Sequence, residues 1–108
     1  IQHIIDSERV FGYRALTFSR NDPNSLPGFD ENEYVKLSSA NEKPYKGLLE
    51  ELKSVRLSTI LLLKALKESD LIMTGTASGK ALSVKALGYI TSGHLLHHLK
   101  IIEDRYLV

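Results

Sequence analysis

The histidines are the strongest candidates for chemistry in this sequence, because three of the four fall between positions 94 and 98. His94 and His98 are spaced i, i+4, which would place both rings on one face of a helix, a single turn apart. Two imidazoles in that arrangement can reach one divalent cation. His97 lies beside that face, and we interpret it as a ligand, a donor to a ligand or a partly exposed residue.

A structural role for the same pair is the alternative. Both positions continue the inward-facing spacing of a helix, and an unpaired polar group buried there costs a few kcal/mol. Two satisfied core histidines, hydrogen-bonded to a neighbouring helix, would therefore also explain them. Leu95 stands where the zincin signature has its glutamate, which disfavours a protease with a helix-borne base.

His3 strengthens the metal interpretation. It lies near the start of the first predicted helix, and helices distant in sequence can face each other in a bundle. Three neutral imidazoles on one divalent ion leave positions open, as in catalytic sites. Taken alone, His3 would be a surface residue at a frayed end. Asp6, one turn further on, either orients an imidazole as an acceptor or is a solvated acid that favours the helix dipole.

The composition limits which other chemistries are available. The 108 residues include no cysteine, which excludes disulfides, thiolate zinc sites and a cysteine nucleophile. Lys and Arg number 14 against 13 Asp and Glu, for a formal net charge of +1. Since nucleic-acid binding needs a concentrated basic face, we expect no nucleic-acid partner.

Apolar runs are short. The longest, Ile60 to Leu63, is far below the roughly 20 residues that span a bilayer. No basic start followed by an apolar core and a cleavage site is visible. We therefore expect a cytoplasmic protein with no membrane partner.

Helical periodicity dominates the chain. It predicts long helices over 1–20, 44–67 and 83–106, and a short helix over 31–37 with Asp30 and Glu33 at capping-box spacing. No stretch alternates long enough to be a convincing strand, so the small polar residues of 70–80 are predicted to be a plain connector.

Several stretches together resemble the DinB-like (DinB/YfiT) superfamily, in the expected order and over nearly the whole chain. They are His3 to Phe11, Leu26 to Asp30, Ser83 to Ile90, Gly93 to Ile102 and Arg105 to Leu107.

The resemblance implies an all-α, up-down-down-up four-helix bundle that holds a divalent metal through three histidines. Matched residue by residue, these are His3, His94 and His98, which leaves His97 outside the ligand set. Zinc, nickel and manganese are all associated with the family. Relatives include bacillithiol S-transferases and mycothiol-dependent maleylpyruvate isomerases, which implies a small-molecule substrate and an external low-molecular-weight thiol.

One departure from the family concerns the start of the chain. Members usually carry another helix before the one that bears His3. We therefore expect residues 1–108 to be a single DinB-like domain lacking its first helix, either through N-terminal truncation or with a second copy filling the gap as a homodimer. The expected function is a metal-dependent thiol S-transferase or hydrolase. The alternative is a non-catalytic metal-binding or self-associating bundle.

Overall fold

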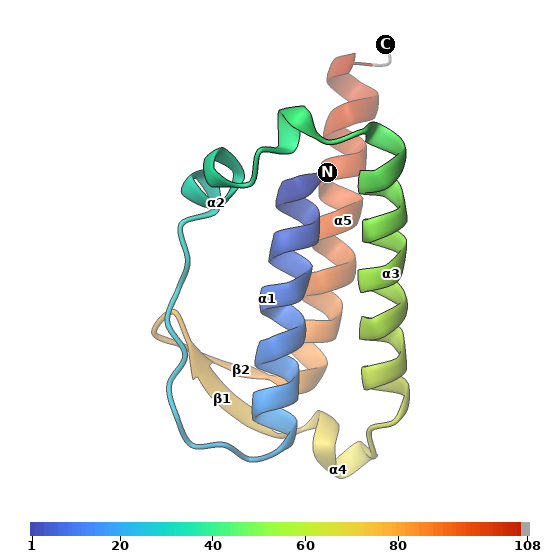
Figure 1. Cartoon of the computed structure of the whole chain (residues 1–108). Helices are drawn as coiled ribbons and strands as arrows, with labels where there is room; N and C mark the ends of the chain where they lie inside the picture. The colour runs from blue at the N-terminus through green and yellow to red at the C-terminus, as the bar shows by residue number, and fades with distance from the viewer. Residues whose placement is uncertain (107–108) are drawn as a thin grey trace.

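Three long helices lie side by side: α1 (Gln2–Ser19), α3 (Tyr45–Lys64) and α5 (Val84–Tyr106). The computed structural model describes residues 1–106, so Leu107 of the last family-like stretch lies outside the described residues. In Figure 1, α1 and α3 run in the same direction and α5 runs antiparallel to both. This is the order of direction expected for the last three helices of an up-down-down-up bundle.

The helical content confirms the mostly α-helical class predicted from periodicity. Each long helix begins and ends within three residues of its predicted bounds, and α2 (Glu31–Leu37) matches its prediction at both ends. A four-helix bundle as such is not seen among the described residues, where the other helices, α2 and α4 (Glu68–Leu71), are short.

The segment between α1 and α3 is folded onto the bundle by α2. The Asp30 side chain accepts hydrogen bonds from the backbone N–H groups of Asn32 and Glu33, which caps the helix as predicted. The rings of Phe29 and Tyr34 pack across this cap with centroids 5.1 Å apart. A 3₁₀ turn, Ala40–Glu42, then leads to α3.

The segment between α3 and α5 corrects the prediction of a plain connector. After α4, strands β1 (Thr74–Ala77) and β2 (Lys80–Ser83) pair as an antiparallel hairpin. Its two turn residues, Ser78 and Gly79, both have positive φ, at 52° and 75°, as a twisted two-residue hairpin loop requires.

Neighbouring backbone stabilises this short hairpin, which is why its own sequence did not reveal it. The N–H of Leu26 donates to the carbonyl of Thr76, and the N–H of Ser78 donates to the carbonyl of Leu26. Four-residue strands are too short to show a clear alternation, and the pairing of Leu26 is a tertiary contact.

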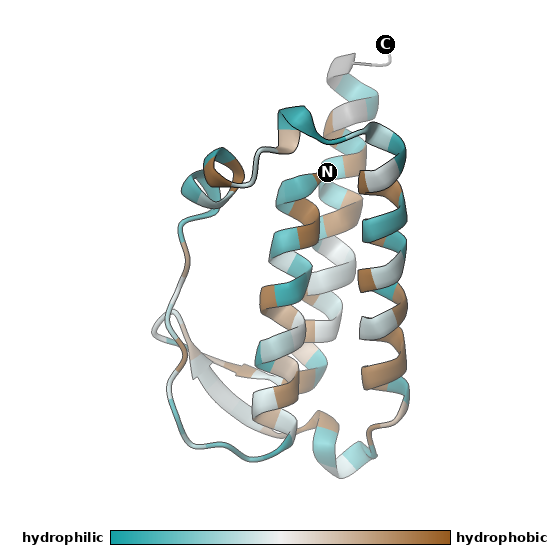
Figure 2. Ribbon diagram, in the orientation of Figure 1, coloured by the Kyte–Doolittle hydropathy of each residue, from teal (hydrophilic) through white to brown (hydrophobic). Residues whose placement is uncertain are grey.

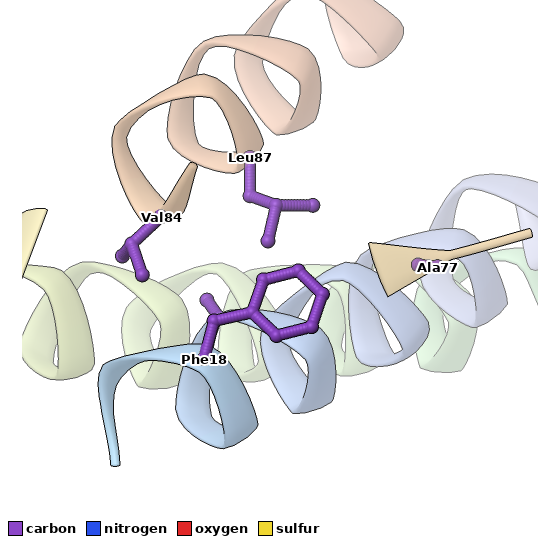
Figure 3. Close-up of a cluster of buried hydrophobic side chains, with 5 residues drawn as sticks. Phe18, Ala77, Val84 and Leu87 are labelled. Atoms are coloured by element: carbon purple, nitrogen blue, oxygen red, sulfur yellow. The ribbon is translucent and has the colours of Figure 1, made fainter. Parts of the chain in front are cut away.

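The main hydrophobic core lies at the hairpin end of the helices (Figure 3). Phe18 of α1 is fully buried against Ala77 of β1 and against Val84 and Leu87 at the start of α5. The Ser83 hydroxyl, which accepts from the N–H of Ala86, starts α5 at this point. The packing fixes how α5 is rotated against α1.

An apolar groove remains between α3 and α5, because α1 contacts both helices while they meet each other only sparsely. The groove encloses about 320 Å³ and includes Leu57, Ile60 and Leu95 in its lining. The lower turns of α3 are markedly apolar in Figure 2, and Leu61 there is 58% exposed.

No helix among residues 1–106 is both long and apolar enough to cross a membrane.

A buried ion pair joins α1 to α3. Glu8 is 2% exposed, and its carboxylate accepts from Nε and Nη2 of Arg56 at 2.6–3.1 Å and from the hydroxyl of Thr59 at 2.9 Å. A second pair between the same helices, Arg9 with Glu51, is more exposed. A buried carboxylate depends on its partners, because an unpaired charge in the interior is costly.

Arg56→Met is expected to lower the free energy of unfolding by about 3–5 kcal/mol, because it leaves the Glu8 carboxylate buried without its cation. Arg9→Met, the matched exposed pair, is expected to cost less than about 1 kcal/mol. Denaturant unfolding of both variants measures the difference. Equal losses in the two variants would contradict a dominant role for the buried pair.

Candidate metal centre

Three imidazoles meet where the first turn of α1 faces the C-terminal half of α5. The Nε2 atom of His94 lies 3.1 Å from Nε2 of His3 and 3.1 Å from Nε2 of His98. One ring nitrogen from each of the three falls within 4.8 Å of the others. The sequence-predicted set, His3, His94 and His98, is therefore brought together across 91 residues of chain.

The helices position these rings through their buried neighbours. On α5, Val84, Leu87 and Thr91 are buried one after another on the face that continues to His94 and His98. On α1, Ile4 and Ile5 are buried beside His3 and hold that end of the helix against the bundle.

The surroundings of the rings orient them. The Ser7 hydroxyl lies 3.5 Å from Nδ1 of His3, on the side of the ring away from the other two histidines. The Phe11 ring meets His94 edge-on, with centroids 5.8 Å apart. A neighbour that engages Nδ1 leaves Nε2 to face the cluster, which is how a ligating imidazole is usually held.

Burial and mutual proximity favour the neutral form of His94 and of His98. Desolvation lowers the pKa of His94 and of His98, and repulsion from nearby imidazoles lowers both further. Glu31 acts in the opposite direction, but more weakly than burial. A neutral imidazole has a free lone pair, the form that binds a metal.

A cavity of about 550 Å³ opens beside His3 and His98. Its other wall is the first two turns of α2, with Glu31, Asn32, Val35 and Lys36. A carboxylate oxygen of Glu31 lies 3.9 Å from Nε2 of His3.

Sequence reasoning missed Glu31 as a site residue. Its position in the first turn of a capped helix is explained by the helix dipole alone, so only the docking of α2 reveals it.

The two other predicted residues lie outside the cluster. Asp6 accepts a hydrogen bond from the side chain of Gln2 at 2.9 Å, and it bonds to no imidazole among residues 1–106. His97 is exposed, with its ring centroid 5.4 Å from that of His98.

The donor set fits a divalent transition metal. Zinc–nitrogen bonds of about 2.0–2.1 Å in tetrahedral geometry separate two ligand nitrogens by about 3.3–3.4 Å, close to the two spacings seen here. Imidazole suits zinc, nickel and other late first-row ions.

The lowered pKa values make the metal-free fold sensitive to acid. In the unfolded chain a histidine has a pKa of about 6.5, so at pH 5.5 the unfolded state binds more protons than the folded state. The stability that the fold gains from holding these histidines neutral is therefore fully present above about pH 6.5 and is lost as the pH falls below that value. In the presence of a chelator, the melting temperature is expected to be lower at pH 5.5 than at pH 7.5.

The variants His94→Gln with His98→Gln, and His97→Gln alone, provide the comparison for this pH dependence. In the double variant, the melting temperature should fall much less between pH 7.5 and pH 5.5, whereas His97→Gln should keep the wild-type fall. If the double variant melts with the same pH dependence as the wild type, the acid sensitivity arises elsewhere.

One comparison with known proteins found a match. No curated protein and no solved structure matched the chain. The sequence model of the DinB superfamily matches residues 1–102, a span that holds all three histidines of the cluster. The chain belongs to the DinB superfamily.

Proposed function

We propose that the chain is a metal-dependent enzyme of the DinB superfamily, in which His3, His94 and His98 hold one divalent ion. The observation that carries the proposal is the convergence of three imidazole nitrogens beside an open cavity. Zinc, nickel and manganese are the candidate ions, and a small molecule is the proposed substrate. Hydrolysis and thiol S-transfer remain the two reaction classes.

A bound ion would supply Lewis acidity, polarising an electrophile or lowering the pKa of a bound water or thiol toward neutrality. The thiol of a transfer reaction would come from outside, because the chain has no cysteine. With three protein ligands, coordination positions remain for such molecules.

The chain's own residues shape the space around the site. Phe11 packs on one side of His94 and limits access from the bundle interior. On the open side, α2 brings a carboxylate, Glu31, and an ammonium, Lys36, to one cavity wall. Lys36 also lies 3.5 Å from Glu33, and both of these side chains are mostly exposed, so the ammonium can turn toward a polar substrate.

Metal titration tests the proposed site directly. Wild-type protein, stripped with a chelator, is expected to bind one zinc or nickel ion per chain by calorimetry and by elemental analysis after dialysis. His94→Ala and His98→Ala are each expected to weaken binding more than about 100-fold, since even outer partners of ligands are worth 10–100-fold. His3→Ala should do the same.

His97→Ala is the matched control, because it removes an imidazole from the same helix turn that is not one of the three grouped ligand candidates. It should bind metal as the wild type does. A wild type that takes up no ion after reconstitution would overturn the site. Metal binding without ester hydrolysis or thiol addition to electrophiles would leave the non-catalytic metal-binding bundle as the better description.

The groove between α3 and α5 favours the second candidate, self-association. We propose that a second copy covers it, because the lining residues Leu57 and Ile60 are 57% and 45% exposed. Sedimentation velocity should give twice the mass of the 12.1 kDa chain. Leu57→Glu with Ile60→Glu should give a monomer, while Tyr45→Glu, an exposed control on the same helix, should stay dimeric. A wild-type monomer at high concentration would refute the dimer.

A further inference from the structure

A second pocket lies along α1, away from the histidine cluster. It encloses about 330 Å³ between α1, the segment from Leu26 to Phe29 and the side of α2 that carries Tyr34. Arg14, at its base, follows His3 by eleven residues, or about 16 Å along the helix axis. The two cavities share α2 as a wall but have no lining residue in common.

Arg14 is a buried cation without an acidic partner. It is 7% exposed, and no carboxylate of residues 1–106 forms an ion pair with it. This contrasts with Arg56, whose charge is met by Glu8. Burial lowers the pKa of the Arg14 guanidinium, although an arginine stays charged in proteins. A desolvated charge of this kind is normally paired, because leaving it alone is costly.

The hydrogen bonds of the Arg14 guanidinium involve only one of its three nitrogens, Nη2. Nη2 donates to the carbonyl of Pro27 at 3.1 Å and lies 3.5 Å from the hydroxyl of Ser78. The N–H groups on Nε and Nη1 donate to no protein acceptor in the described part of the chain. They are not sealed from solvent either, since no buried side-chain nitrogen there lacks a partner. Solvent therefore reaches these donors, and Arg14 is one of the residues that line the pocket.

The rest of the lining indicates which ligand fits. Three aromatic residues, Tyr13, Phe29 and Tyr34, and the apolar Val10 and Leu26 line the same pocket as Arg14, and the lining contains no acid. The other cation of the pocket, Arg9, is already paired with Glu51. A largely apolar pocket with one free cationic edge suits a molecule with an aromatic or apolar body and a single carboxylate. A phosphate, with more charge to satisfy, would need more donors than are present.

We propose that this pocket binds a small aromatic carboxylate, whose carboxylate pairs with Arg14 and whose ring packs between Tyr13, Phe29 and Tyr34. The site is independent of the metal centre. It requires neither an ion nor the three histidines.

Benzoate tests the proposal, with benzamide as a neutral molecule of the same shape. Binding is measured by ¹H–¹⁵N NMR titration of the metal-free protein in a chelator, so that the carboxylate cannot bind through a metal. Benzoate is expected to shift the amide signals of Val10, Phe29 and Tyr34 saturably. Benzamide is expected to bind at least about tenfold more weakly, because a hydrogen bond to a charged group is lost.

Variants separate the pocket from the rest of the molecule. Arg14→Met should abolish saturable binding, and Tyr34→Ala should weaken it several-fold while leaving the fold intact, since Tyr34 is 49% exposed. His3→Ala should leave benzoate binding unchanged, and so should Arg20→Met, which removes an exposed arginine just after α1.

Three results would overturn the proposal: no saturable benzoate shifts, equal binding of benzoate and benzamide, or a folded Arg14→Met protein that binds like the wild type. If Arg14→Met does not fold, the comparison of the two probes and the Tyr34→Ala variant decide. Loss of benzoate binding in His3→Ala would place the carboxylate at the histidine cluster instead.

Discussion

The packing of α1 against α5 is the constraint on which the rest of the structure depends. Every ring of the histidine cluster lies on one of these two helices, and the main core joins the end of α1 to the start of α5. Because Phe18 is locked against Val84 and Leu87, the rotation of α5 is set two to three turns before His94. A sub-turn error in that packing would carry the two α5 imidazoles away from His3.

The histidine cluster opposes the packing of α1 against α5 when its rings are protonated. Nε2 of His3 and Nε2 of His98 each lie 3.1 Å from Nε2 of His94, so the rings repel one another once protonated, and burial adds to that penalty. Natural proteins tend to accept such local conflict at functional positions and compensate for it elsewhere. Here the carboxylate of Glu31 offsets part of that repulsion, because it favours the protonated form of His94 and of His98.

Much of this could be predicted from the sequence. Helical spacing gave the long helices, and the placement of His94 and His98 on inward-facing positions followed from the same spacing. Local spacing does not bring residue 3 to residue 94, so His3 was predicted from the way distant helices face each other in a bundle, and the family-like motifs pointed to the same residue. The capping of α2 by Asp30 was readable because it depends on residues three apart.

The rest depended on contacts that spacing does not encode. Besides its own two strands, the hairpin over 74–83 is hydrogen-bonded to the backbone of Leu26, some fifty residues earlier. The burial of Arg14 follows from the way the segment after α1 folds back over it. Glu8 did leave a signal that was not used: it sits between Ile4 and Phe11 at the spacing of the apolar face, where an acid needs a partner.

The position of the main core has a consequence for how the molecule opens. The core lies at the hairpin end, whereas His3 is fifteen residues from Phe18 along α1, about 22 Å away. The two ends of α1 are therefore held differently, the last turn by the main core and the first turns by Ile4, Ile5 and the pair of Glu8 with Arg56. An ion bridging His3 to α5 would add a further link between the helices at the end outside the main core. Its binding would then suppress fraying of α1 more than it slows global unfolding.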